Sequence, residues 1–233
     1  SSTGNLCFES ASVALRPRKE VTDGLLRQAV SQYSTLAQQL AELARVHGHS
    51  QEMQELYNYS VTHAATETLD EIERFKATTK SPAPGVPVLL FGNVLPDPEA
   101  FQLFEDCGLF VVADELCTGA KQLVPVEIGD EEIHLSIARA LLGRAPCART
   151  FDSSDPGGLG KQLVARVKAA GARGVVTHVM KFCDPYLARL PAVRAELRQA
   201  GISMLVLEGD CTLGALGQYE TRIEAFAEML GEI

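Results

Sequence analysis

A cysteine at the junction between a short apolar run and a helical pattern is the residue of this sequence best placed for chemistry. Cys183 follows the apolar run 174–180 and precedes the stretch 184–199, in which apolar side chains recur at helical spacing. Asp184 can act as the N-cap of that helix, and Pro185 fits its first turn. The dipole at a helix N-terminus favours a thiolate, which is the form of cysteine that binds a metal or an iron–sulfur cluster.

Cysteines also follow two of the three other short apolar runs after residue 85. Together with Cys183 these are Cys117 and Cys211, and each has an Asp or Glu within a few positions in the sequence. Parallel strands bring their carboxyl ends to one edge of a sheet, and open α/β sheets bind ligands at that edge. We therefore interpret Cys183 and Cys117 as candidate ligands of a metal or cluster, although an isolated cysteine is usually a core residue.

Polar side chains at the start of the last helical pattern are expected at the same edge. Gln218, Thr221 and Arg222 occupy the first turns of the pattern that runs from 218 to 230. A helix N-terminus with an arginine one turn in can bind an anion or a thioester carbonyl, so these three are candidates for the substrate side of a site. An amphipathic helix with Ile223 buried and its charges in solvent explains the same residues equally well.

Several familiar catalytic and nucleotide-binding motifs are absent. The glycine-rich stretch 157–162 fails the phosphate-loop pattern, because Asp155 replaces its first glycine and Gln162 replaces the magnesium-binding Ser or Thr. Neither G-x-G-x-x-G, G-x-S-x-G nor H-E-x-x-H occurs. His178 lies within an apolar run and is interpreted as a core histidine. Cys147 lies in a loop, where it either supports a site or is structural.

Composition excludes several classes of protein. The formal net charge of −9, without a basic cluster, argues against a nucleic-acid partner. No apolar run approaches the roughly 20 residues that span a bilayer, and the first residues lack the features of a secretory signal. The six cysteines are spread along the chain without a C-x-x-C pair, so a disulfide framework is not expected and a cytoplasmic protein is.

The elements that must position these residues fall into two parts. Helical periodicity predicts a helical lead-in over residues 18–80, and a Pro/Gly-rich linker at 81–85 separates it from the rest. Residues 81–233 alternate short apolar runs with amphipathic helices, which predicts an α/β domain with a flavodoxin-like parallel sheet of about four strands. Residues 1–17 have no assigned fold and are similar to a tag remnant. The expected strands are Val86–Phe91, Leu109–Ala113, Gly174–Val179 and Ile202–Leu207.

Three segments of the chain carry a resemblance to a known family. The segments are D-E-L-C-T-G-A-K at 114–121, K-F-C-D-P at 181–185 and G-Q-Y-E-T-R-I-E-A-F at 217–226. Together with the helical lead-in, they resemble the subunits of 2-hydroxyacyl-CoA dehydratases and benzoyl-CoA reductases, specifically the carboxy-terminal part. The resemblance covers residues 18–233.

This resemblance implies an iron–sulfur enzyme of anaerobic metabolism that acts on an acyl-CoA thioester. The expected cofactor is a [4Fe–4S] or double-cubane cluster, with Cys183 as a metal ligand and Cys117 close to the cluster. The implied partners are a second family subunit or a homodimer partner, and an ATP-hydrolysing activator that delivers a low-potential electron. The reaction is either dehydration of a 2-hydroxyacyl-CoA or reduction of the benzoyl-CoA type.

The sequence departs from the family pattern in two respects. The other cluster cysteines of the family lie in an amino-terminal α/β domain that this sequence lacks, so the chain is expected to be incomplete by itself. Lys121 replaces the usual arginine, which weakens bidentate anion binding there. Two alternatives stay open, namely a non-catalytic assembly or binding module without a cluster, and a flavin- or nucleotide-binding flavodoxin-like domain.

Overall fold

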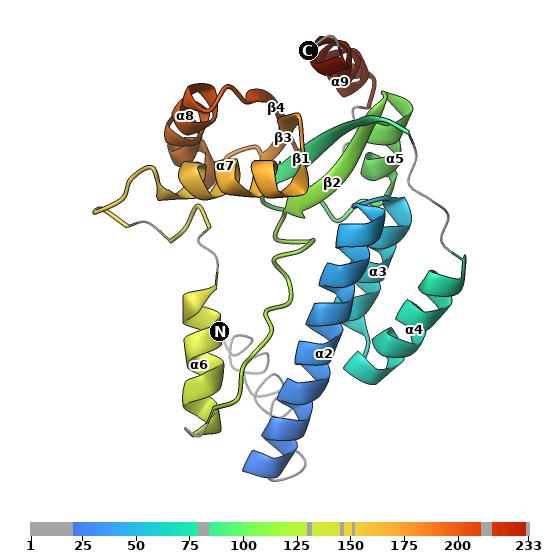
Figure 1. Ribbon diagram of the computed structural model, residues 1–233, viewed down its shortest axis with the longest axis vertical. Helices are drawn as coiled ribbons and strands as arrows, with labels where there is room; N and C mark the ends of the chain where they lie inside the picture. The colour runs from blue at the N-terminus through green and yellow to red at the C-terminus, as the bar shows by residue number, and fades with distance from the viewer. Residues whose placement is uncertain are drawn as a thin grey trace, which may run out of the picture.

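The computed structural model describes residues 21–78, 84–129, 132–144, 147–150, 152–210 and 216–231. Within these residues, four parallel strands form one sheet in the order β2-β1-β3-β4, with helices on both faces (Figure 1). The strands are β1 (Val86–Gly92), β2 (Leu109–Glu115), β3 (Gly174–Met180) and β4 (Ser203–Gly209). The predicted α/β class is therefore confirmed, and each strand begins and ends within two residues of its expected bounds.

Two pairs of helices cover the two faces of the sheet, α5 (Glu99–Asp106) with α9 (Leu216–Gly231) and α7 (Gly158–Ala170) with α8 (Asp184–Gln199). The fifth helix of this part, α6 (Ile133–Gly143), contacts α2. Val88 and Leu90 of β1 belong to one core with α5 and α9, whereas Leu89 and Phe91 belong to a second core with α7 and α8. Successive strand residues point to opposite faces, so this continuous apolar run is buried on both sides.

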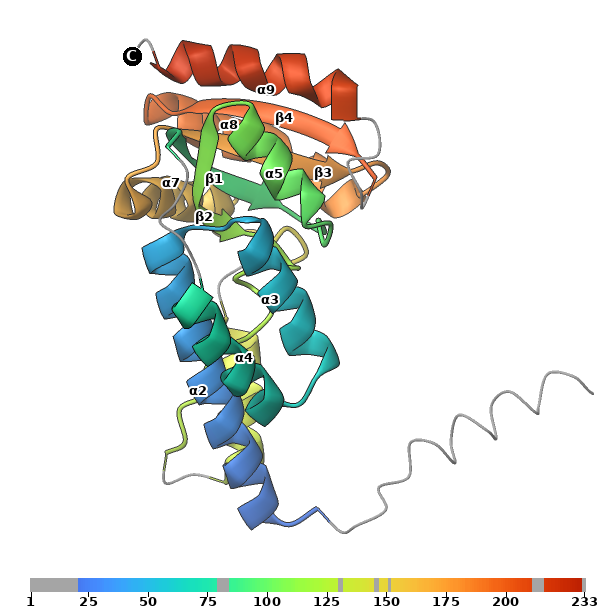
Figure 2. The ribbon, with the colours of Figure 1, turned by 90° about the vertical axis from the view of Figure 1, so that its right-hand side faces the viewer.

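The helical lead-in has a core of its own. It consists of α2 (Asp23–His47), α3 (Gln51–Thr62) and α4 (Ala65–Thr78), which share the buried residues Leu36, Leu40, Met53, Leu56 and Ile72. These helices extend away from the sheet on the side of β2 (Figure 2). Thr22 caps α2 by accepting a hydrogen bond from the Leu25 N–H at 3.4 Å.

The lead-in meets the sheet at the turn between α2 and α3. Gly48 ends α2 with φ of 72°, a left-handed conformation that favours glycine. A Cβ atom at this position would lie 2.4 Å from the Phe110 ring and 2.6 Å from the Val111 carbonyl oxygen. The next residue, His49, donates its backbone N–H to that same carbonyl at 2.7 Å. The close approach fixes the start of α3 against β2.

One local expectation was wrong, and several lie outside the described residues. Cys183 itself is the N-cap of α8, with ψ of 79°, and Asp184 is already helical, so Asp184 is not the cap. Most of the linker at 81–85 falls outside the described ranges, as do residues 1–17 and Cys211. None of the helices in the described ranges is long and apolar enough to span a bilayer.

Candidate functional site

The candidate site lies at the carboxyl ends of β1 and β3, where the chain leaves the sheet in opposite directions. From β1 the chain crosses by α5 to β2, and from β3 it crosses by α8 to β4 on the other face. Open α/β sheets bind ligands at such a switch point. Gly92 ends β1 here, and a Cβ atom on it would lie 2.1 Å from the His178 carbonyl oxygen. Only glycine allows the two strand ends to approach this closely.

Asn93 ties the loops after β1, β2 and β3 together. Its side-chain Oδ1 accepts a hydrogen bond from the Met180 N–H at 3.2 Å, and its carbonyl oxygen accepts one from the Cys117 N–H at 2.7 Å. Asn93 is buried, with 6% of its surface exposed. Asn93 therefore holds the end of β3 with its side chain and the Cys117 backbone with its own carbonyl group.

The loop that carries Cys117 is organised around a buried carboxylate. Oδ1 of Asp114 accepts hydrogen bonds from the backbone N–H groups of Leu116 at 3.0 Å and Ala120 at 2.9 Å. A Cβ atom on Gly119 would lie 2.2 Å from that oxygen, so the loop can close around the carboxylate only with glycine there. This requirement explains the D-E-L-C-T-G pattern: the aspartate holds the loop and the glycine lets it close.

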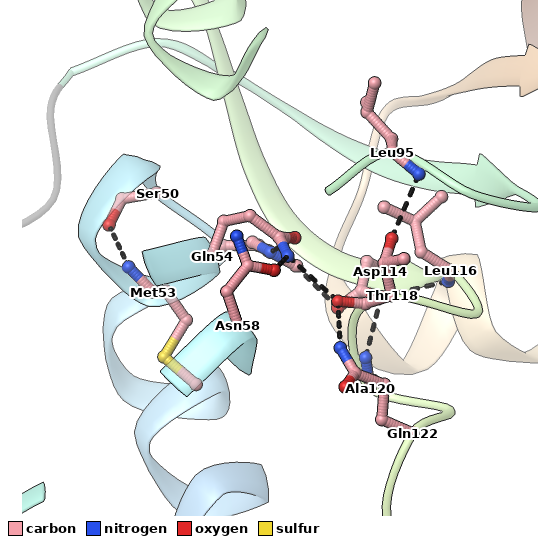
Figure 3. A network of polar contacts seen from close by, with 11 residues as sticks. Ser50, Met53, Gln54, Asn58, Leu95, Asp114, Leu116, Thr118, Ala120 and Gln122 are labelled. Atoms are coloured by element: carbon pink, nitrogen blue, oxygen red, sulfur yellow. Dashed lines mark hydrogen bonds and ion pairs between the residues drawn. The ribbon is translucent and has the colours of Figure 1, made fainter. Parts of the chain in front are cut away.

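Side chains of the helical lead-in reach the same loop. His49 Nδ1 lies 2.7 Å from Asp114 Oδ2, and its Nε2 lies 2.9 Å from Gln54 Oε1. Gln54 Nε2 donates to the Thr118 carbonyl oxygen at 2.9 Å (Figure 3). It also donates to Asn58 Oδ1 at 2.8 Å. The lead-in thus helps to hold the loop that presents Cys117.

The directions of these hydrogen bonds define the charge of the network. Because the amide nitrogen of Gln54 must donate to the Thr118 carbonyl, its Oε1 accepts from His49. Both ring nitrogens of His49 then donate, the second one to Asp114, which is the pattern of an imidazolium paired with a carboxylate. Burial alone would raise the pKa of Asp114, but the charge and hydrogen bond of His49 and the two loop N–H groups lower it. The His49 ring also stacks on Phe101 at 4.2 Å.

Cys183 occupies a strained turn between β3 and α8. The preceding residue, Phe182, has φ of 62°, which is uncommon for a non-glycine residue, and its side chain is 90% exposed. The Cys183 N–H is bonded to the Met180 carbonyl oxygen at 3.1 Å, and its own carbonyl accepts the Leu187 N–H as the first hydrogen bond of α8. The thiol is partly exposed and lies at the positive end of the helix dipole.

The hydroxyl group of Tyr186 is buried and lies near enough to three thiols for them to affect its pKa. This side chain is 4% exposed, and its hydroxyl donates a hydrogen bond to the Gly92 carbonyl oxygen. Burial raises its pKa, and the nearby thiols of Cys117, Cys147 and Cys183 raise it further, with a hydrogen-bonding contact to Cys117. The two predicted candidates, Cys117 and Cys183, thus both lie near Tyr186, Cys117 in the lining of the cavity described below and Cys183 against the core that contains Tyr186.

Cys147 is the cysteine near Tyr186 for which the sequence left open whether it supports a site or is structural. It lies in a short turn in which its backbone N–H donates to Thr150 Oγ1 at 2.8 Å. Partial burial would raise the pKa of its thiol, but N–H groups of Arg149 and Thr150, the Thr150 hydroxyl and the charge of Lys121 lower it. The C-x-x-T spacing, which lets a threonine hydroxyl reach back to the cysteine, was the only signal in the sequence.

A cavity of about 700 Å³ opens beside two of these thiols. Cys117 and Cys147 line it, and Phe91 and Leu163 contribute apolar surface. This volume lies within the range of small-molecule sites, about 300–1,000 Å³. The arrangement can offer soft sulfur donors and an apolar surface to one ligand. No group of three or more His, Cys, Asp or Glu side chains in the described ranges is arranged to hold a metal ion by itself.

The three candidates on α9 lie apart from this cavity. Gln218, Thr221 and Arg222 are exposed, and none of them lines the cavity. Arg222 Nη2 donates to the Val206 carbonyl oxygen at 2.7 Å, beside the middle of β4. Tyr219, a buried residue of the same helix turn, donates a hydrogen bond from its hydroxyl to the Glu208 carbonyl oxygen at 2.8 Å. The structure thus places α9 along β4, and a role of these residues on the substrate side stays a prediction.

Comparison with known proteins gives consistent matches. The model of the family "2-hydroxyglutaryl-CoA dehydratase, D-component" matches residues 16–230. The lactoyl-CoA dehydratase subunit beta of Anaerotignum propionicum is 29% identical over 160 residues, which cover 68% of this chain and 42% of the relative. The (R)-phenyllactyl-CoA dehydratase beta subunit of Clostridium sporogenes is 24% identical over 169 residues, which cover 72% of this chain and 44% of the relative.

A third relative is a putative dehydratase subunit, YjiM, of Escherichia coli (strain K12). It is 31% identical over 129 residues, which cover 54% of this chain and 32% of the relative. In all three comparisons the matched region spans less than half of the relative's length.

Proposed function

The chain belongs to the family of the 2-hydroxyglutaryl-CoA dehydratase D-component, and we propose that it is the thiol-bearing part of an acyl-CoA dehydratase subunit. The observation that carries the proposal is that Cys117 and Cys147 line one cavity at the switch point of the sheet, where Cys183 is the N-cap of α8 and lies near Tyr186. The names of the three matched relatives, each a dehydratase subunit, favour dehydration over reduction of the benzoyl-CoA type.

Cys183 and Cys117 are the residues that we propose as ligands of an iron–sulfur cluster. Thiolates are the donors that such a cluster takes, and both sulfurs lie at the site. A [4Fe–4S] cluster commonly takes four thiolates, so in this proposal further ligands complete the set beyond Cys183 and Cys117. When bound, the cluster would supply a low-potential electron to the thioester substrate.

The side chains around the thiols have supporting roles in this proposal. The N-cap position of Cys183 places its sulfur at the positive end of α8, which stabilises negative charge on a ligating sulfur. Tyr186 holds the end of β1 by donating a hydrogen bond from its hydroxyl to the Gly92 carbonyl oxygen. Gln218, Thr221 and Arg222 are kept as candidates for contact with the substrate. A second subunit or homodimer partner and an ATP-hydrolysing activator complete the proposed system.

The test is an absorbance spectrum from 300 to 500 nm of the anaerobically isolated protein with its co-expressed partner subunit, together with iron and sulfide content. We expect a brown protein whose iron is lost in Cys183→Ala and retained in the control Cys107→Ala. Cys107 is a suitable control because it is buried against α9, and burial with the nearby Glu224, Glu220 and Asp106 carboxylates raises its pKa to about 11.

Two outcomes would contradict the proposal. A Cys183→Ala variant with unchanged colour and iron would remove Cys183 from the ligand set. A colourless, iron-free protein that binds a partner subunit would favour the alternative, a non-catalytic assembly or binding module of the same fold. A flavin spectrum would instead favour a flavodoxin-like cofactor domain.

A further inference from the structure

The outer edge of β4 is open in the part of the chain that the structure describes. β4 is the last strand in the order β2-β1-β3-β4, and no backbone group of a described residue pairs with its outer side. The opposite edge differs, because the helical lead-in covers part of β2 and the His49 N–H donates to the Val111 carbonyl oxygen at 2.7 Å (Figure 2). An open strand edge presents N–H and C=O groups that can pair with a further strand.

The hydrogen bonds of β4 show which of its residues face outward. The Gly209 carbonyl oxygen faces β3, since it accepts the Lys181 N–H at 2.8 Å just beyond the end of β3. Successive residues of a strand turn their backbone groups to opposite sides, so the residues one position away from Gly209 and every second residue before them face outward. The outward-facing residues are Met204, Val206 and Glu208.

Two side chains of α9 contact this edge without closing it. Arg222 Nη2 donates to the Val206 carbonyl oxygen at 2.7 Å, and the Tyr219 hydroxyl donates to the Glu208 carbonyl oxygen at 2.8 Å. A carbonyl oxygen has two acceptor positions, so each can also accept an N–H from a neighbouring strand. The outward N–H groups are not involved in either contact.

The strand itself lacks the features that usually protect an edge. It contains neither lysine nor proline, and its register with β3 is continuous, without a bulge. Its first four residues, 203–206, are only partly buried, whereas β3 is buried at every position except the last. Three of these four residues are apolar, so the edge offers apolar surface as well as backbone donors and acceptors.

The two ends of β4 carry opposite charges. A hollow of about 430 Å³ at the start of the strand is lined by Arg194 and Arg198 of α8, together with Met204. At the other end, Glu208 and Asp210 are exposed. An antiparallel neighbour with the same sequence would bring its acidic end to the arginines of the first strand, whereas a parallel neighbour would set like charges side by side.

The faces of the sheet agree with this pairing. An antiparallel pair centred on Val206 places Met204 of one copy opposite Glu208 of the other. Met204 packs against the core that contains α8, and period-two alternation puts Glu208 on that same face. A two-fold axis perpendicular to the sheet keeps this face common to both copies, so Glu208 of each copy lies beside the arginine-lined hollow of the other.

We propose that the outer edge of β4 binds the same edge of a second copy of this chain in antiparallel orientation, so that one sheet runs through both copies. The inference deepens the proposed function, which names a second subunit or a homodimer partner, by giving this surface to a second copy. It requires no cluster, because the contacts are backbone hydrogen bonds, apolar surface and two symmetry-related clusters of opposite charge.

The first experiment is sedimentation velocity of the metal-free 233-residue chain over a range of concentrations. We expect a reversible dimer with a dissociation constant on the order of micromolar, as for small interfaces. Arg198→Glu and Glu208→Arg should each weaken the dimer about tenfold or more, because each sets like charges together at both contacts. Glu42→Arg is the control, since it makes the same charge change at an exposed position of α2 and should leave the dimer unchanged.

An equimolar mixture of the two weakened variants is the most specific test. In a mixed dimer, the new glutamate meets the new arginine at one contact, and the original Arg198 and Glu208 meet at the other. The mixture should therefore dimerise about as well as the unchanged chain, although neither variant does so alone. Misfolding of either variant would not produce this recovery.

A cross-link tests the position of the axis. In a hydrogen-bonded antiparallel pair, opposite Cα atoms lie about 5.5 Å apart, which a disulfide can span. Val206→Cys treated with glutathione disulfide should form a covalent dimer, as two thiols are oxidised and two molecules of glutathione are released. Val46→Cys, at an exposed position of α2, should not.

The outcomes separate this inference from the proposed function. A monomer at every concentration, a dimer that both charge reversals leave unchanged, or a mixture without recovery would overturn the inference. A chain that pairs only with a different subunit would overturn it as well. All of these measurements use metal-free protein, so their failure would leave the iron–sulfur proposal standing, and a protein without iron would leave the dimer standing.

Discussion

Replacement of Asp114 tests whether the buried pair with His49 holds the Cys117 loop. In Asp114→Ala, His49 loses its partner and the N–H groups of Leu116 and Ala120 lose their acceptor. Breaking a buried ion pair by removing one partner costs about 3–5 kcal/mol, because a buried charge is left without compensation. We expect the free energy of unfolding to fall by about that amount.

Asp114→Asn should be much milder, for a reason that follows from the hydrogen-bond directions. The asparagine oxygen can still accept both loop N–H groups, and its amide can donate to Nδ1 of a neutral His49 ring. Nε2 of His49 can then continue to donate to Gln54. Every polar group keeps a partner, so we expect a loss of about 1–2 kcal/mol, the difference between a charged and a neutral hydrogen bond.

The pH dependence provides a second check. The folded-state pKa of Asp114 is lowered, so the stability that it contributes is fully present above its unfolded pKa of about 3.9 and is lost as pH falls through the folded value. The difference between the wild-type protein and Asp114→Asn should therefore shrink from pH 5 towards pH 2. Urea midpoints followed by far-UV circular dichroism measure both effects.

Two results would refute this reasoning. Equal losses in the alanine and asparagine variants would mean that the charge pair, and not hydrogen-bond satisfaction, decides the stability. A loss below about 1 kcal/mol in Asp114→Ala would mean that the buried network does not hold the loop.

Three further predictions concern the cysteines and the strand ends of the candidate site. Iodoacetamide at pH 7 should alkylate Cys147 much faster than Cys107. The pKa of the Cys147 thiol is lowered, whereas burial and nearby carboxylates raise the pKa of the Cys107 thiol to about 11. Equal alkylation rates in peptide mapping would contradict this prediction. Gly92→Ala should lower the free energy of unfolding, measured in urea, by about 3 kcal/mol or more, because the new Cβ would lie 2.1 Å from the His178 carbonyl oxygen. A decrease below about 1 kcal/mol would contradict that close approach. Phe182→Gly should leave the thermal midpoint equal or higher, because a left-handed non-glycine residue costs roughly 1–2 kcal/mol; a clear decrease would show that the exposed ring is stabilising.

The sheet could be predicted from the sequence because its signal is local. Runs such as 174–180 are apolar throughout and bounded by polar turns, and this pattern is typical of strands buried on both faces. The order of Cys117 and Cys183 after successive strands then placed both at one edge by topology alone. Their common proximity to Tyr186 is consistent with that edge, although the tyrosine itself gave no signal in the sequence beyond helical spacing.

Contacts between distant segments could not be predicted in the same way. His49 and Asp114 are 65 residues apart and belong to different parts of the fold, and no periodicity relates them. Cys147 lies in the long connection between β2 and β3 that also contains α6. The length of this connection does not indicate which of its residues return to the site. The cap at Cys183 was missed because Asp184 is the better capping residue by type, whereas the turn at Phe182 shifts the helix start by one residue.

The helical lead-in is part of the site in a physical sense and is not only a docking surface. Gln54 bonds directly to the Thr118 carbonyl, and His49 bonds to the carboxylate around which the loop closes. A displacement of α3 would leave these buried groups without partners, at a cost of about 1–3 kcal/mol each. The position of α3 and the conformation of the loop that carries Cys117 are therefore stabilised by the same hydrogen bonds.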